Sequence, residues 1–203
     1  MDRNSIREIT HLVASLLVLT IAFSYPSTSS QALAIAAIGV GTGFLLHELA
    51  HKFTAQRYGF VADYEASPIG LLLAIGLSIF TGGSFVFAAP GAVMIRGKKV
   101  PYGQDQDYYW NRQNEKEFAY ISVSGAVVNL ILAVLFIMIS LVVADTFVIN
   151  VLWRAAFINV FLAGFNMIPI GPLDGAKVWR YNRVLWSIVG IPSILLFFIL
   201  QTL

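Results

Sequence analysis

The segment HELAH carries the residues of this sequence that are best suited to bind a metal ion. It places His47 and His51 four residues apart, with Glu48 beside the first histidine. On a helix this spacing puts the two imidazoles about 40° apart on one face, so both can reach a single ion. In such an H-E-x-x-H arrangement the histidines bind Zn²⁺, and the glutamate takes a proton from a water whose pKa the metal lowers towards about 7. The pattern predicts a hydrolytic zinc centre.

The alternative interpretation is that these are interfacial polar residues at the end of a helix. The chain contains only three histidines, so H-E-x-x-H is expected by chance in roughly one sequence in a thousand of this composition. Burying histidine and glutamate close to hydrocarbon is also unfavourable for a helix that has only a structural role. We therefore favour the metal site.

A third ligand is needed, because catalytic zinc sites usually have three protein ligands and one open position. The chain has no cysteine, which leaves histidine or a carboxylate. His11 lies in the first apolar segment and is interpreted as an interfacial residue. Asp174 is the candidate, because prolines and glycines in NMIPIGPLDG break the backbone around it, and irregular backbone at membrane depth is tolerated where it forms a site. Alternatively, Asp174 caps the next helix.

The composition requires these residues to be positioned inside a membrane. The chain is 58% hydrophobic and only 12% charged, about half the charge content of a soluble domain. A helical crossing needs ~20 apolar residues. Five blocks contain no Asp, Glu, Lys or Arg: 9–47, 66–95, 118–144, 155–173 and 184–203. The sequence therefore predicts an all-α polytopic membrane protein with about five to six transmembrane helices.

The first block should hold two helices, because SYPSTSS interrupts its apolar pattern. A cleaved signal peptide is the alternative for the first of them, since two arginines precede an apolar stretch. We favour a retained helix because the suspected cleavage site lies inside the pattern of the next span. The expected long helices lie near 6–24, 31–56, 118–144, 149–168 and 184–202.

The block at 66–95 predicts a re-entrant hairpin of a helix and a β-strand. Its segment 68–80 is too short for a core of ~30 Å and runs into TGGS. The following segment 85–95 is rich in β-branched and aromatic residues and contains Pro90 and Gly91, which favours an extended strand. The polar segment 96–117 is expected to be the longest aqueous loop.

The basic residues predict the orientation of the chain. With the hairpin placed in this way, twelve of the thirteen Lys and Arg residues fall on one side, and only Arg154 lies on the other. This distribution predicts a multi-pass cell-membrane protein with a cytoplasmic amino terminus, an external carboxyl terminus and an active site near the cytoplasmic side. The net charge of +2 gives no reason to expect a nucleic-acid partner.

HELAH and the pattern N-x-x-P-x-x-x-x-D-G, here NMIPIGPLDG from Asn166 to Gly175, together resemble the site-2 protease family of intramembrane zinc metalloproteases. The resemblance covers roughly 31–183, and the two motifs together are highly specific. FVFAAPGAV and SGAVVN resemble further family features more loosely. Family members commonly carry an additional PDZ or cystathionine-β-synthase (CBS) domain. This sequence shows neither, so we expect a single membrane-embedded metalloprotease domain over 1–203.

The resemblance implies a role for each candidate residue. His47, His51 and Asp174 would bind one zinc ion per chain, and Glu48 would be the general base. Asn166 would help to hold the substrate or the developing oxyanion. The implied reaction is cleavage of a peptide bond within or beside a transmembrane helix of a membrane protein, often in regulated intramembrane proteolysis.

A helical substrate hides its amides in its own hydrogen bonds, so cleavage requires a locally extended segment. The strand at 85–95 could pair with that segment by strand addition, which makes Phe85, Val86 and Phe87 candidate substrate-binding residues, with Asn129 as a further one. Alternatively, the strand only packs against the catalytic helices. The expected partners are a transmembrane substrate and the lipid bilayer, and the oligomeric state is left open.

A different class of function also fits the same residues. In a metal-binding membrane transporter or channel, the broken helices and the ligands would line an ion pathway. Glu48 discriminates between the two functions, because transport needs ligands but no base beside the metal.

Overall fold

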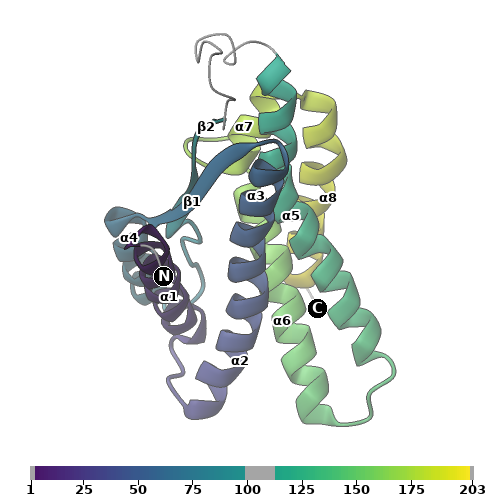
Figure 1. The fold of residues 1–203 in the computed structure, drawn as a ribbon. Coiled ribbons are helices and arrows are strands. Elements are labelled where there is room, and N and C mark those ends of the chain that lie inside the picture. Colours follow the sequence, from purple (N-terminus) through teal and green to yellow (C-terminus); the bar gives the residue numbers. More distant parts are fainter. Residues whose placement is uncertain (1–2, 99–112, 202–203) are drawn as a thin grey trace.

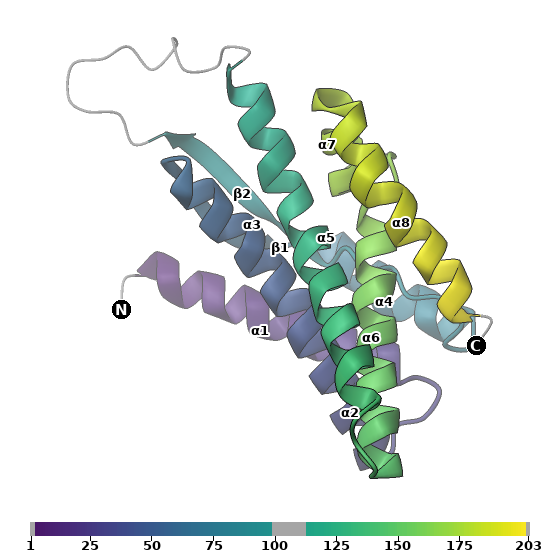
Figure 2. The same cartoon turned by 90° about the vertical axis from the view of Figure 1, so that its right-hand side faces the viewer.

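The computed structural model describes residues 3–98 and 113–201, and within them it is built mainly of helices (Figure 1). Figures 1 and 2 show a bundle of long helices, with α1, α4 and two short strands on one side of it. In chain order the elements are α1 (Arg3–Ser24), α2 (Ser30–Val40), the π-helical segment η1 (Gly41–Leu45), α3 (Leu46–Arg57), β1 (Phe60–Ala66), α4 (Pro68–Phe80), β2 (Gly91–Lys98), α5 (Gln113–Ser140), α6 (Thr146–Asn166), α7 (Asp174–Tyr181) and α8 (Arg183–Gln201).

Five helical segments are long and apolar enough to cross a membrane, which confirms the predicted polytopic helical class. They are Asn4–Ser24, Ser30–Arg57, Lys116–Ser140, Thr146–Asn166 and Arg183–Leu200. The predicted ends of the helices agree with these to within a few residues. Most of the loop predicted at 96–117 lies outside the described residues.

Short polar side chains fix where several helices begin. Ser29 precedes α2 and accepts a hydrogen bond from the backbone N–H of Ala32 at 3.2 Å. Asp145 does the same for α6 through the N–H of Val148 at 2.9 Å. These caps satisfy backbone donors that have no partner inside the helix. The polar segment SYPSTSS therefore separates α1 from α2, as predicted.

The hairpin predicted from the block at 66–95 is present. The 13-residue helix α4 is followed by a segment that returns to its start, where the N–H of Ser67 donates to the carbonyl oxygen of Pro90 at 2.8 Å. The strand, however, begins later than predicted: it is Gly91–Lys98, and 85–89 has no regular structure. Pro90 explains this start, because it has no N–H to donate to a ladder.

The partner of this strand, β1, was missing from the prediction. It pairs antiparallel with β2, placing Tyr64 opposite Val93 and Ala66 opposite Gly91. The buried residues of β1 are Phe60, Ala62 and Tyr64, which alternate with less buried ones. This period of two is the ordinary signal of a half-buried strand.

Helix α1 covers the outer edge of β1. Glu8 accepts a hydrogen bond from the N–H of Tyr64 at 3.1 Å, and His11 Nδ1 accepts one from the N–H of Ala66 at 3.3 Å. Ser15 Oγ lies 2.8 Å from the Tyr64 hydroxyl. The three residues lie on one face of α1, since they are three and four positions apart. His11 therefore binds backbone. Among the described residues no strand pairs with the outer edge of β2, which we call the free edge of the sheet.

The span that carries HELAH changes its packing partner at the π-helical segment. Before His47, Gly39 and Gly43 lie against α6 so closely that a Cβ would come within 2.5 Å of Ile158 Cδ1 and 2.6 Å of Leu162 Cδ1. Small residues at this spacing permit such close helix packing. The extra residue of a π-turn changes the direction in which the later side chains of the span point, and α3 packs on α5 instead.

Candidate active site

The structure brings His47, His51 and Asp174 together, although 127 residues separate the first from the last. Asp174 Oδ2 lies 2.9 Å from His51 Nε2 and 3.4 Å from His47 Nε2. One possible ligand atom from each residue lies within 4.8 Å of the other two. Helix α3 supplies both histidines and the first turn of α7 supplies the aspartate. Among the described residues this is the single group of three or more such side chains.

The surroundings of His51 indicate that a proton or a metal ion lies between its ring and Asp174. Nδ1 lies 2.7 Å from the carbonyl oxygen of Ile121, which can only accept, so Nδ1 carries a hydrogen. In the neutral ring Nε2 then has a lone pair, and this buried atom has no hydrogen-bond partner among the described residues although Asp174 Oδ2 is near. Two acceptors in contact need a proton or a metal ion between them. Two imidazoles and a carboxylate are ligands that suit zinc.

His47 is oriented by Asn129 on α5. The Asn129 side-chain amide lies 3.3 Å from His47 Nδ1, and Asn129 is fully buried. The amide atom placed nearest Nδ1 is Nδ2, while Oδ1 has no partner among the described residues. With the amide turned by 180°, Oδ1 accepts the ring hydrogen of Nδ1. That leaves His47 Nε2 free to face Asp174, as metal-binding histidines commonly do.

Asp174 lies in the first turn of α7, where Leu173 rather than Asp174 occupies the capping position. Its Oδ1 accepts a hydrogen bond from Lys177 Nζ at 3.0 Å, while Oδ2 faces the histidines. Burial alone would raise the pKa of this carboxyl, but the His51 charge and the His47 hydrogen bond outweigh it and hold the pKa well below its usual range. Asp174 is therefore an anion that faces both rings.

Glu48 is buried beside this cluster, at 8% exposure. Its Oε2 is enclosed and has no hydrogen-bond partner among the residues that the structure describes. An enclosed carboxylate oxygen without a partner is unfavourable unless it serves a site. Glu48 thus has a free oxygen for a water or a substrate proton.

Gly125 on α5 provides the space in which both rings fit. A Cβ at this position would lie 2.6 Å from His47 Nε2 and 2.6 Å from His51 Nε2, far inside contact distance. Sequence analysis linked SGAVVN only loosely to the family. The structure gives Gly125 a more specific part, because it clears the two nitrogen atoms that would bind the metal.

Gly125→Ala should therefore lower zinc affinity about ten- to a hundredfold, the range for contacts that orient ligands. The added methyl group displaces rings that are held on their other side by Ile121 and Asn129. The zinc affinity is obtained from the amount of zinc bound to the purified chain at a series of free zinc concentrations that a chelator buffers. Gly41→Ala is the matched control, because a Cβ there meets nothing within 4 Å. Equal affinity in both variants would show that the rings do not need this space.

The other predicted site residues lie on α6 and the segment that contacts it. Asn166 Nδ2 donates to the carbonyl oxygen of Leu162 at 3.0 Å. The Phe85 and Phe87 rings both contact Phe165, with centroids 6.2 Å and 5.4 Å away. Val86 is buried, at 3% exposure. These residues pack near the carboxyl end of α6, and their roles toward substrate stay predictions.

Comparison with known proteins agrees with this site. The model of peptidase family M50 matches residues 142–193. The chain is 38% identical over 195 residues to "Putative zinc metalloprotease MJ0611" of Methanocaldococcus jannaschii, covering 95% of this chain and 93% of that protein. It is 28% identical over 141 residues to "Zinc metalloprotease MJ0392" of the same organism, covering 67% of this chain and 30% of that protein. No solved structure matches.

The chain therefore belongs to peptidase family M50. This confirms the predicted resemblance to the site-2 protease family. Together with the five apolar helices, it makes the chain a multi-pass membrane metalloprotease.

Proposed function

We propose that this protein is an intramembrane zinc metalloprotease that cleaves a transmembrane protein within or next to its spanning segment. The observation that carries the proposal is a cluster of two buried imidazoles on a candidate membrane span and one carboxylate on α7, beside a glutamate with a free oxygen. His47, His51 and Asp174 would hold one zinc ion. A bound zinc ion would supply Lewis-acid activation of water and of the scissile carbonyl.

Each chain residue then has a step to perform. Glu48 accepts the proton of the attacking water through its unpartnered oxygen and afterwards donates it to the leaving amine. The carbonyl oxygen of Ile121 holds the ring hydrogen of His51 at Nδ1. Asn129, with its amide turned so that Oδ1 faces His47 Nδ1, would do the same for His47, which leaves both Nε2 atoms to hold a metal. Asn166 would contact the substrate or the developing oxyanion, as the family resemblance implies.

The free edge of β2 is the surface that fits an unwound substrate. The N–H groups of Tyr64 and Ala66 point to α1, away from β2. In an antiparallel pair the residues opposite them then also point their backbone groups away from the partner strand. Val93 and Gly91 therefore direct their backbone groups to the outer edge of β2. An extended substrate could pair there by strand addition. The segment Phe85–Phe87 would act as the apolar wall that leads to this edge, and Asn129 stays a candidate contact.

Val93→Pro should lower cleavage about three- to twelvefold relative to Val93→Ala, the effect of losing one hydrogen bond. Proline removes the N–H that would bind the substrate, while alanine retains it and controls for lost packing. Zinc content should be unchanged in both. Rates are measured on the same transmembrane substrate. If the two variants cleave equally, substrate pairs elsewhere.

The proposal extends to the orientation and setting of the protein. The distribution of basic residues supports a cytoplasmic amino terminus and an active site near the cytoplasmic side. We also propose one catalytic domain over 1–203, with its core at about 31–183, acting in regulated intramembrane proteolysis.

Comparative membrane proteomics tests the proposed function in cells. Cells that carry the intact chain are compared with cells that carry a Glu48→Gln variant. The expected result is a membrane protein that stays whole with the variant and yields a fragment ending in or beside its spanning segment with the intact chain. Identical proteomes, with both chains expressed, would contradict the proposal.

A further inference from the structure

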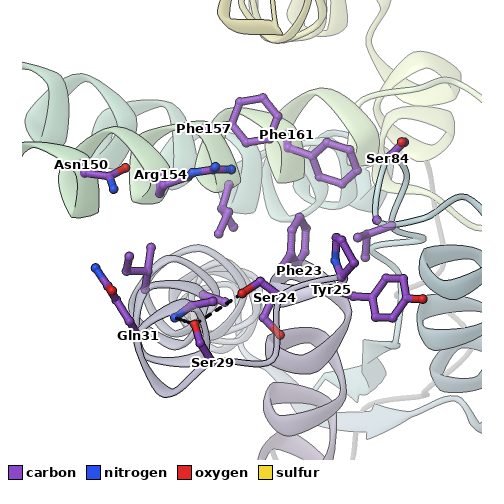
Figure 3. Close-up of a pocket in the computed structure, with 18 residues that line it drawn as sticks. Phe23, Ser24, Tyr25, Ser29, Gln31, Ser84, Asn150, Arg154, Phe157 and Phe161 are labelled. Carbon is purple, nitrogen blue, oxygen red and sulfur yellow. Dashed lines mark hydrogen bonds between the residues drawn. The ribbon is translucent and has the colours of Figure 1, made fainter.

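A cavity of about 530 Å³ is lined by the start of α2, well before the histidines of the same span, and Figure 3 shows it in close-up. Helix α6 forms one wall, and the α1–α2 connection with the start of α2 forms the other. One lining residue, Ile35, precedes His47 by twelve positions in the same span, or about 18 Å of helix. The lining combines aromatic and polar side chains, including Phe23, Tyr25, Gln31, Ser84, Asn150 and Phe157.

Arg154 is the one charged residue in this lining. It makes no hydrogen bond or ion pair within the part of the chain that the structure describes. It is the ninth residue of α6, roughly 12 Å along the helix axis from Thr146 at about 1.5 Å per residue. It is also the one basic residue that sequence analysis placed on the external side. Its side chain is exposed on the described chain, so within a span its charge needs water, a headgroup or a ligand, and such residues usually mark a binding site or pathway.

The rest of the lining indicates what would pair with Arg154. Asn150 and Gln31 offer amide donors from the two walls of the cavity, and Figure 3 shows both on the side where Arg154 lies. Phe157 and Phe161 form an apolar wall farther along α6. A guanidinium with neighbouring amides recognises a phosphate. An aromatic wall next to it accepts hydrocarbon.

We propose that this cavity binds the phosphate of a membrane phospholipid, with part of an acyl chain against the phenylalanine wall. The span Asn4–Ser24 ends, and the span Ser30–Arg57 begins, beside residues that line the cavity. The ends of spans lie at the depth where lipid headgroups are abundant. Arg154 reaches the phosphate by extending toward that rim, as long cationic side chains do in membranes. The bound lipid would contact α6, the α1–α2 connection and residues 83–86 of the returning segment, which together line the cavity.

The test is native mass spectrometry of the delipidated full-length chain in a neutral detergent, with dioleoyl phosphatidylglycerol as the probe. One lipid should bind per chain, and Arg154→Gln should weaken binding about tenfold or more, because a charge-assisted hydrogen bond is lost. Arg154→Lys should lose less, since it keeps the charge but not the planar fork. Arg57→Gln, at the end of α3, is the matched control and should bind like the original chain.

Two further arms distinguish the source of the phosphate. Dioleoylglycerol, which has the acyl chains but no phosphate, should not bind to this cavity, and inorganic phosphate should bind far more weakly than the lipid. Equal lipid binding by folded Arg154→Gln, Arg154→Lys and Arg57→Gln chains would overturn the proposal. Inorganic phosphate binding as tightly as the lipid would overturn the lipid assignment. Loss of substrate cleavage in Arg154→Gln, with no lipid adduct on the original chain either, would overturn the proposal and assign the cavity to substrate.

Discussion

Replacing Glu48 with Gln should lower peptide-bond hydrolysis by about a hundred- to ten-thousandfold, the usual contribution of a general base. Glutamine has nearly the same shape but cannot accept the proton of water. The side chain is buried with one oxygen unpartnered, so no neighbouring group of the described chain takes over this task. Zinc content should remain near one per chain, because the three ligands are untouched. Cleavage rate and zinc content are measured on the same purified samples.

Asp145→Asn is the matched control for this charge change. It is also an acid-to-amide substitution, but it lies at the cap of α6, a position that asparagine fills as well as aspartate. It should leave cleavage and zinc unchanged. A Glu48→Gln chain that keeps activity within a few fold of the original would exclude Glu48 as the base. Equal zinc uptake into vesicles by the Glu48→Gln chain and the original chain, without proteolysis by either, would instead favour the transporter function.

His47→Ala and Asp174→Ala should each remove most of the bound zinc. The loss of zinc affinity should exceed the factor of about ten to a hundred that is typical when a residue orienting a ligand is removed. Each substitution deletes one of the three groups that converge in the site. Zinc would be measured on the purified chains after dialysis against a zinc buffer. Cleavage should disappear together with the metal.

His11→Ala is the control for these ligand variants. His11 is the third histidine, but it binds the backbone of Ala66 and does not belong to the cluster. Its removal should leave zinc in place. Full zinc in Asp174→Ala would show that the aspartate only serves the first turn of α7. Full zinc in His47→Ala would place the metal elsewhere.

The metal cluster could be predicted because its determinants are local in sequence. The i, i+4 spacing of HELAH fixes the geometry of both histidines before any tertiary contact forms. Asp174 could be inferred because the prolines and glycines around it rule out a regular span. The spans followed from long charge-free blocks, which the bilayer requires.

The supporting contacts could not be predicted in the same way. Ile121 contributes a backbone carbonyl, a group that every residue has, so its sequence gives no signal. Gly125 fits two different roles, and only the packing of α3 on α5 shows which one applies. Strand β1 was missed although Phe60, Ala62 and Tyr64 alternate along it, because the strand has only seven residues and two of them are acidic.

The central claim is that this chain cleaves a peptide bond at membrane depth with zinc held by His47, His51 and Asp174. The most direct measurement uses the purified full-length chain in liposomes with a transmembrane substrate, and maps the cut by intact-mass analysis of the products. The account predicts a cut within or next to the spanning segment, which chelation abolishes and added zinc restores. Cuts confined to the soluble parts of the substrate, or cleavage that persists after zinc is removed, would contradict it.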